Sequence, residues 1–293
     1  MWRIWATALL WGLNWPAVKI ILADVSPLAL RAAGLSLALV LLACITVLSG
    51  RSLAIARGEI GRVLVSGLLS VAGFNICAVF AQLTLPTSRA TILTFTMPIW
   101  AALFGRIVLG ERLDRLRQIA LAFGAAGLGV LATPFWPMIR DGGAPLGLLF
   151  ALGAAIFWAA GTVYMKARPV SADPMAITTW QIGTAAIVCT LAMVLFENPR
   201  FSLADPRVAV AFAYHVALPQ ALAYIIWFDL VRRVPASTAG LGTLLIPIFG
   251  VAGAIILLGD RPTALDFAGF ALILAGVTID QAWRAYAAQK SPT

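Results

Sequence analysis

The sequence predicts an all-α integral membrane protein whose ten transmembrane helices form two inverted five-helix repeats. Composition predicts the membrane class, because 61% of the 293 residues are hydrophobic, 11% are charged and the mean hydropathy is +0.95. Soluble domains carry roughly 25% charged residues and rarely expose large apolar patches. Ten spans of about 20 residues leave too little chain for an extramembrane domain. Soluble enzymes and ABC-type pumps are thereby excluded, and an internal repeat predicts the inverted arrangement.

The predicted spans are apolar runs that stop at charged residues, Pro and Gly, as helix ends commonly do. In the first half they cover residues 3–22, 29–49, 62–85, 88–108 and 115–133. In the second half they cover residues 146–166, 174–195, 208–231, 236–258 and 264–283. Isolated strands are excluded because the hydrocarbon core offers their backbone no hydrogen-bond partners.

The distribution of Lys and Arg predicts the orientation. With the N-terminus in the cytoplasm, fourteen of the 21 Lys and Arg residues fall in cytoplasmic segments. Cytoplasmic loops carry the excess of positive charge in membrane proteins. We therefore expect both termini in the cytoplasm of a multi-pass protein of the cell membrane, most simply a bacterial inner membrane.

An internal repeat divides the chain into residues 1–140 and 141–288, followed by a polar, disordered tail at 289–293. An offset of 147 aligns Trp11 with Trp158 and Lys19 with Lys166. An offset of 149 aligns residues 88, 90 and 98 with 237, 239 and 247, and the run 110–112 with 259–261. Because five is an odd number, the second repeat enters the membrane from the opposite side. Inverted repeats are common in secondary transporters, which bind substrate at the midplane between the halves.

Several motifs resemble those of EamA-type transporters in the drug/metabolite transporter superfamily. They are ALLWGLNWPAVK at 8–19 with SPLALRAAG at 26–34, and SRATILTFTMPIWAALFGRIVLGERL at 88–113 with GAAGLGVLA at 124–132. The second half repeats the pattern in ASTAGLGTLLIPIFGVAGAIILLGDRP at 236–262 and FAGFALILAGVTI at 267–279. The resemblance spans nearly the whole chain and implies a transporter. Within the family, the tryptophan-rich first helix and the length resemble an aromatic amino acid exporter.

Aromatic and amide side chains at helical spacing are the candidate substrate ligands. Asn14 in mid-membrane needs a partner, which is either a neighbouring helix or a polar substrate. Indoles provide flat surfaces for an apolar or aromatic group. The set of predicted substrate-binding residues is Trp11, Asn14, Trp15, Asn75, Trp158, Tyr224 and Trp227. Trp136 instead lies near a helix end and is typical of an interfacial belt.

Four further residues have two interpretations each. Lys19 either extends its ammonium to the membrane interface or binds a substrate carboxylate. His215 is either a hydrogen-bonded structural histidine or a proton relay. Pro98 and Pro247, at matched positions, are either hinges or tolerated kinks, because each removes a backbone hydrogen bond.

The residues favour a secondary transporter that exports small amphipathic metabolites, most simply aromatic or bulky amino acids, by alternating access around a central cavity. No Asp or Glu lies near the centre of a predicted span, where ion-coupled pumps keep an acid, so the sequence favours a facilitator. The alternative is broad efflux of drugs or cationic metabolites by proton antiport, since indoles also bind cations. We expect no enzymatic activity, cofactor, metal or nucleic acid. The expected partners are a small-molecule substrate and the lipid bilayer, and the chain is a monomer or homodimer.

Overall fold

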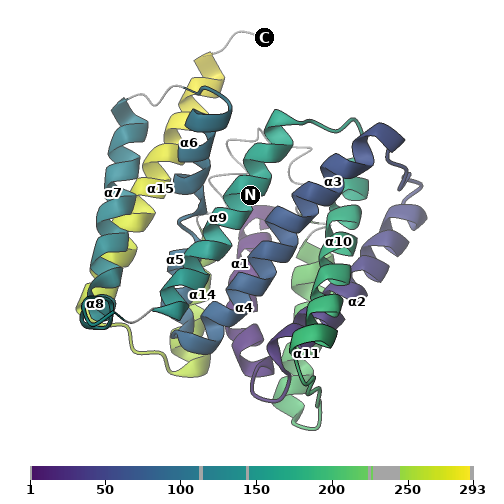
Figure 1. Ribbon diagram of the computed structural model, residues 1–293, viewed down its shortest axis with the longest axis horizontal. Helices are drawn as coiled ribbons and strands as arrows, with labels where there is room; N and C mark the ends of the chain where they lie inside the picture. Colours follow the sequence, from purple (N-terminus) through teal and green to yellow (C-terminus); the bar gives the residue numbers. More distant parts are fainter. Residues whose placement is uncertain (1, 112–114, 143–144, 224–225, 227–244, 291–293) are drawn as a thin grey trace.

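The computed structural model describes residues 2–111, 115–142, 145–223, 226 and 245–290, and the regular elements of this part of the chain are all helices (Figure 1). Its one β-type contact is an isolated antiparallel bridge between Val25 and Phe201. Seven helical segments within these residues are long and apolar enough to cross a membrane. The protein is therefore a multi-pass helical membrane protein, as the composition predicts.

Except at 88–108, the helices of the first half follow the predicted spans closely. They are α1 (Trp2–Ile21), α2 (Pro27–Leu48), α3 (Ile60–Ser66), α4 (Phe74–Thr84), α5 (Thr87–Thr94), α6 (Met97–Val108), α7 (Arg115–Ala132) and α8 (Trp136–Arg140). Short 3₁₀ segments precede α3 and α8, at Arg57–Glu59 and Thr133–Phe135. Glu197, from the second half, accepts the backbone N–H groups of Leu28 and Ala29 at 3.0 and 2.9 Å and so caps α2.

The described helices of the second half are α9 (Leu146–Ala167), α10 (Pro174–Phe196), α11 (Pro206–Ala217), α14 (Leu245–Leu258) and α15 (Ala264–Lys290). Asp173 and Asp205 cap α10 and α11, accepting the N–H groups of Met175 and Arg207 at 2.8 and 2.7 Å. A proline follows each of these acids, and Asp before Pro is a common start of a helix. Parts of the predicted spans 208–231 and 236–258 lie outside the described residues.

Two membrane segments contain a π-helical turn at equivalent places. The first, η2 (Gly67–Gly73), lies between α3 and α4, and the second, η4 (Leu218–Leu222), follows α11. The repeat offset of 149 superimposes one on the other. Single π-helical turns disturb the regular backbone pairing of an α-helix and are frequent at functional sites.

The predicted span 88–108 differs from expectation, because it is two helices and not one kinked helix. The chain leaves α5 after Thr94 and enters α6 at Met97. Pro98, in the first turn of α6, has no N–H to continue the ladder. Thr96 fixes the interruption: its hydroxyl donates to the Leu93 carbonyl at 2.7 Å and accepts the Trp100 indole N–H at 3.2 Å.

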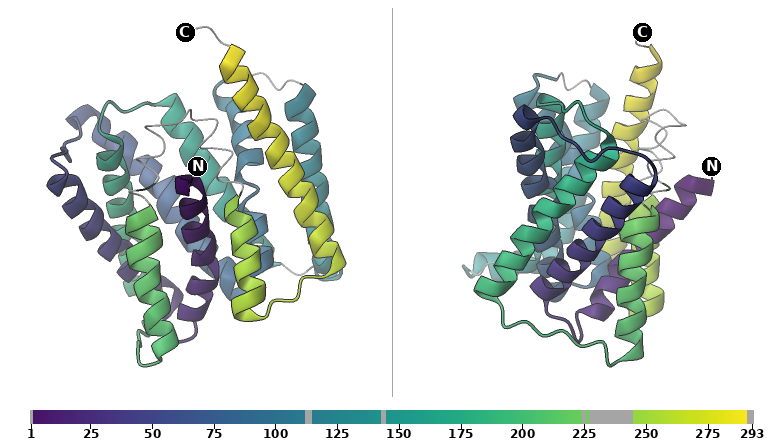
Figure 2. Two further views of the ribbon diagram at one scale, coloured as in Figure 1. Left: turned by 180° about the vertical axis from the view of Figure 1, so that it is seen from behind. Right: turned by 90° about the vertical axis from the view of Figure 1, so that its right-hand side faces the viewer.

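Packing pairs the helices across the two halves of the chain. Helix α7 lies along α15, and α2 lies along α10 (Figures 1 and 2). Helix α1 packs against α14 and α11, while α9 packs against α6, α5 and α4. Each of these contacts joins an element of residues 1–140 to one of residues 141–288. Among the described elements, exchanging the two halves maps the α7–α15 and α2–α10 contacts onto themselves and the α1–α14 contact onto the α9–α6 contact.

Glycines allow the close approach of α7 and α15. A Cβ atom on Gly127 would lie 2.8 Å from the carbonyl oxygen of Gly269, and one on Gly276 would lie 2.6 Å from that of Ala120. Backbone atoms cannot move aside cheaply, so neither position accommodates a side chain. Small residues at helix contacts are the usual means of close packing in membranes.

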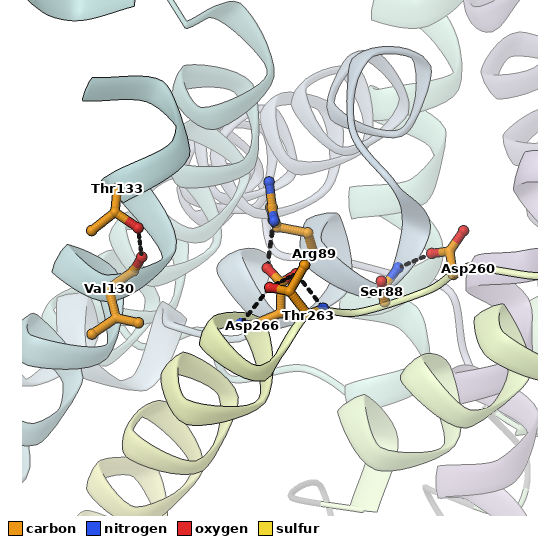
Figure 3. A network of polar contacts seen from close by, with 7 residues as sticks. All are labelled: Ser88, Arg89, Val130, Thr133, Asp260, Thr263 and Asp266. Atoms are coloured by element: carbon orange, nitrogen blue, oxygen red, sulfur yellow. Dashed lines mark hydrogen bonds and ion pairs between the residues drawn. The ribbon is translucent and has the colours of Figure 1, made fainter. Parts of the chain in front are cut away.

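A polar cluster ties the start of α5 to the start of α15 (Figure 3). Arg89 donates through Nε to Asp266 at 2.9 Å, and Thr263 donates to the same carboxylate through its backbone N–H and hydroxyl, both at 2.9 Å. Beside it, the Ser88 N–H donates to Asp260 at 2.8 Å. The side chains of Arg89 and Asp266 are 16% and 8% exposed, so this ion pair is shielded from solvent.

Candidate functional site

A cavity of about 420 Å³ lies between the two halves. Its volume falls within the roughly 300–1,000 Å³ range of small-molecule sites. Five of the predicted substrate ligands line it, namely Trp11, Asn14, Trp15, Asn75 and Trp158, and so do Pro98 and Pro247. The walls come from α1, α2, η2, α4, the α5–α6 interruption, α9, α10, η4, α14 and α15. Tyr224 and Trp227 lie outside the described residues.

Aromatic side chains form much of the cavity wall. The Trp11 indole N–H donates to the Pro219 carbonyl in the π-helical turn η4 at 3.0 Å. Trp15 is 7% exposed, and its ring centroid lies 6.3 Å from that of Phe95. Trp158, which is 37% exposed, meets Phe74 edge-on at 5.1 Å. Aromatic pairs of this geometry hold their rings in defined positions.

The two predicted amides are both part of the wall. Asn14 Oδ1 lies 2.7 Å from Nδ1 of His215, which is buried and does not line the cavity. Asn14 therefore joins α1 to α11, which supplies the neighbouring-helix partner, and it also faces the cavity. Asn75 donates to the Val71 carbonyl of its own helical segment at 2.9 Å. His215 is a hydrogen-bonded partner of a wall residue.

The two repeat-related lysines are not among the cavity-lining residues, and each lies near an acid of the opposite half. Lys19 donates to the backbone carbonyl of Gln82, and the Asp260 carboxylate lies within electrostatic range of it. Lys166 pairs with Glu111. Since Glu111 and Asp260 are themselves repeat-related, each lysine lies near the acid of the other half. Lys19 is not among the cavity-lining residues.

The glycines before these two acids also match. Gly110 and Gly259 have φ of +67° and +71°, a left-handed conformation that glycine adopts without strain. In each case the following acid donates its N–H back to the preceding helix, Glu111 to Gly105 at 3.2 Å and Asp260 to Ala254 at 3.2 Å. The Gly–acid pair at 110–111 and at 259–260 is thus a helix-terminating turn that presents a carboxylate.

Several wall residues are absent from the predicted set, among them Phe74, Phe95, Gln82 and Arg31. Phe74 and Phe95 are single aromatic residues in apolar runs, and nothing in the runs indicates which face turns inward. Gln82 lies on the same face of α4 as Asn75, and this helical spacing indicates that both side chains point toward the cavity. Arg31 was counted only as a charge that sets topology, although it lies five residues inside the apolar run of α2.

Comparison with known proteins identifies the family. The profile of the EamA-like transporter family matches residues 2–133 and 145–279. The chain belongs to the EamA-like transporter family. As an EamA-like protein, it is a membrane transporter of small metabolites and not an enzyme.

Relatives and solved structures agree with this assignment. A probable amino-acid metabolite efflux pump of Salmonella typhimurium is 26% identical over 289 residues, covering 92% of this chain and 90% of that protein. A probable terminal-alkyne amino-acid exporter of Streptantibioticus cattleyicolor is 22% identical, covering 95% and 92%. The uncharacterized transporter YoaV of Bacillus subtilis is 22% identical, covering 93% of each chain. A crystal structure at 20% identity shares the fold, with a TM-score of 0.67 over 99% of this chain and 98% of the other.

Proposed function

We propose that this EamA-like protein exports amino acids with aromatic or bulky side chains by alternating access around the central cavity. The observation that carries the proposal is the cavity wall, which combines indoles and amides from both halves of the chain. Indoles bind apolar and aromatic groups, and amides hydrogen-bond an ammonium or carboxylate. One relative is named a probable amino-acid metabolite efflux pump and another a probable terminal-alkyne amino-acid exporter, which supports the substrate class.

The proposed architecture is ten transmembrane helices in two inverted repeats, residues 1–140 and 141–288. The cross-half packing, the matched π-helical turns and the matched acid-bearing turns all support a two-fold axis in the membrane plane. In such a transporter, rocking of one half against the other exposes a fixed midplane site to each side in turn. The Lys166–Glu111 ion pair beside one matched turn is suited to break and re-form during this motion.

The proposed orientation places both termini in the cytoplasm of the inner membrane. Single cysteines at Ser52 and Met138, both exposed, then label from opposite sides in a variant whose native cysteines are replaced. Labelling of both positions from one side would contradict the topology.

We further propose that transport is driven by the substrate's own gradient. The described residues that line the cavity include no Asp or Glu, and ion-coupled carriers usually keep such an acid within the membrane. The test is uptake of radiolabelled L-phenylalanine into proteoliposomes, with protein-free liposomes as the control. Uptake above the control that is unaffected by a protonophore supports the proposal. A protonophore that abolishes accumulation would refute the facilitator mechanism and make His215 the first residue to mutate.

A further inference from the structure

The guanidinium of Arg31 is a buried cation at the cavity wall. Arg31 lies in the second turn of α2, is 5% exposed and lines the cavity. Its Nε has no hydrogen-bond partner, and Arg31 makes no hydrogen bond or ion pair with any described residue. A buried donor without a partner loses its hydration and gains nothing in return, so it needs an explanation.

Among the described residues, no carboxylate forms an ion pair with Arg31. Glu197, which caps α2, is bonded to Ser26 Oγ at 2.7 Å and to the backbone N–H groups of Leu28 and Ala29. Two groups interact electrostatically with Arg31. They are Cys189, a thiol on α10, and His215, an imidazole that is hydrogen-bonded to Asn14. None of these groups offers a free carboxylate.

A structural role does not account for this arrangement. A buried charge without a partner destabilises a protein, and ionisable groups at membrane depth mark functional sites. A cation near the N-terminus of a helix also opposes the helix dipole. Arg89 illustrates the structural alternative, because its guanidinium is fully engaged by Asp266.

We infer that Arg31 is the site for a substrate carboxylate, an inference that rests on the proposed amino-acid transport. Guanidinium presents two parallel N–H donors that match the two oxygens of a carboxylate. The same wall carries an unpartnered acceptor, Oε1 of Gln82, which is 2% exposed. A substrate that places its carboxylate at Arg31 and its ammonium at Gln82 is a zwitterion, as an amino acid is. The cationic wall also disfavours substrates that carry only positive charge.

The experiment compares three probes in proteoliposomes: L-phenylalanine, 3-phenylpropionate, which lacks the ammonium, and L-phenylalanine amide, which lacks the carboxylate. The variants are wild type, Arg31→Met, Arg31→Lys and the control Arg89→Met. In Arg31→Met we expect uptake of both carboxylate probes to fall about tenfold or more, with uptake of the amide within about twofold of wild type. Arg31→Lys keeps the charge but not the paired donors, so it should be intermediate.

A second readout separates binding from folding. Without ligand, Arg31→Met should melt at or above the wild-type temperature, because it removes a buried unpaired charge, whereas Arg89→Met should melt below it. 3-Phenylpropionate should raise the melting temperature of wild type and of Arg89→Met but not of Arg31→Met. If wild type transports no probe and yet is stabilised by 3-phenylpropionate through Arg31, amino-acid transport fails and the carboxylate site stands.

Three results would overturn the inference. The first is near-normal L-phenylalanine uptake by Arg31→Met. The second is an equal loss of all three probes together with a lower melting temperature, which would make Arg31 structural. The third is the absence of any stabilisation of wild type by 3-phenylpropionate.

Discussion

Substituting alanine at two neighbouring glycines of α7 separates helix packing from helix propensity. A Cβ at Gly127 would lie 2.8 Å from the Gly269 carbonyl oxygen and 2.9 Å from the Ile273 backbone nitrogen, both on α15. A Cβ at Gly129, two residues later, would meet nothing within 4 Å. The chemical change is identical at both sites, and only one of them forces two backbones apart.

The magnitudes follow from these contacts. Overpacking costs about 1–3 kcal/mol, whereas replacing glycine by alanine within a helix gains about 0.5–1 kcal/mol. Gly127→Ala should therefore lower the free energy of unfolding by about 1–2 kcal/mol. Gly129→Ala should leave it unchanged or raise it slightly. The two variants should differ by about 2 kcal/mol.

The assay is reversible unfolding in mixed detergent micelles containing increasing SDS, followed by tryptophan fluorescence. A third variant, Gly276→Ala, repeats the test from the α15 side, since its Cβ would lie 2.6 Å from the Ala120 carbonyl oxygen. If Gly127→Ala and Gly129→Ala unfold at the same SDS fraction, the close α7–α15 contact is wrong.

Three further outcomes are expected. Trp158→Ala should reduce phenylalanine flux about 2- to 10-fold, because it removes an aromatic contact of about 0.5–1.5 kcal/mol. Trp136, in α8, is 65% exposed, so Trp136→Ala should leave the flux unchanged, and equal flux from both variants would mean that the Trp158 indole only packs. Asp266→Ala should lower the free energy of unfolding by about 3–5 kcal/mol, because it leaves the largely buried Arg89 guanidinium without its partner. Asp141 has a side chain that is 70% exposed, so Asp141→Ala should change little, and similar SDS midpoints for the two variants would contradict the burial of the Arg89–Asp266 pair. Asn14→Leu should lower the free energy of unfolding by about 1–3 kcal/mol, because the buried His215 imidazole loses its hydrogen bond. An unchanged SDS midpoint would argue against that bond.

Sequence patterns predicted the helix bounds well because apolar length and terminal charges determine where a chain enters and leaves a membrane. The predicted spans at 3–22, 146–166 and 174–195 each agree with a helix to within one residue at both ends. The interruption at Phe95–Thr96 was not predicted, because a proline indicates a lost hydrogen bond but not whether the helix bends or stops. The π-helical turns were also missed, because they leave no signature in residue type.

The cavity was predictable in part. Trp11, Asn14 and Trp15 stand on one helical face, and the repeat then pointed to Trp158. Arg31 was missed because a charge within six residues of a span's end is most simply assigned to the interface. Whether such a side chain reaches water or the interior depends on the neighbouring helices, and those neighbours come from the other half of the chain.

The cross-half packing also has a consequence for biogenesis. Helices α1, α2 and α7 find their main partners in α14, α10 and α15, which are synthesised last or much later. The spans of residues 1–140 must therefore wait in the bilayer without their lasting contacts while the ribosome makes the rest of the chain. During that interval, stability rests on each span's own backbone hydrogen bonds and hydrophobicity, and lipid occupies the surfaces that later become the interior. Truncation after residue 140 should leave an inserted but protease-sensitive half, which co-expression of residues 141–293 rescues.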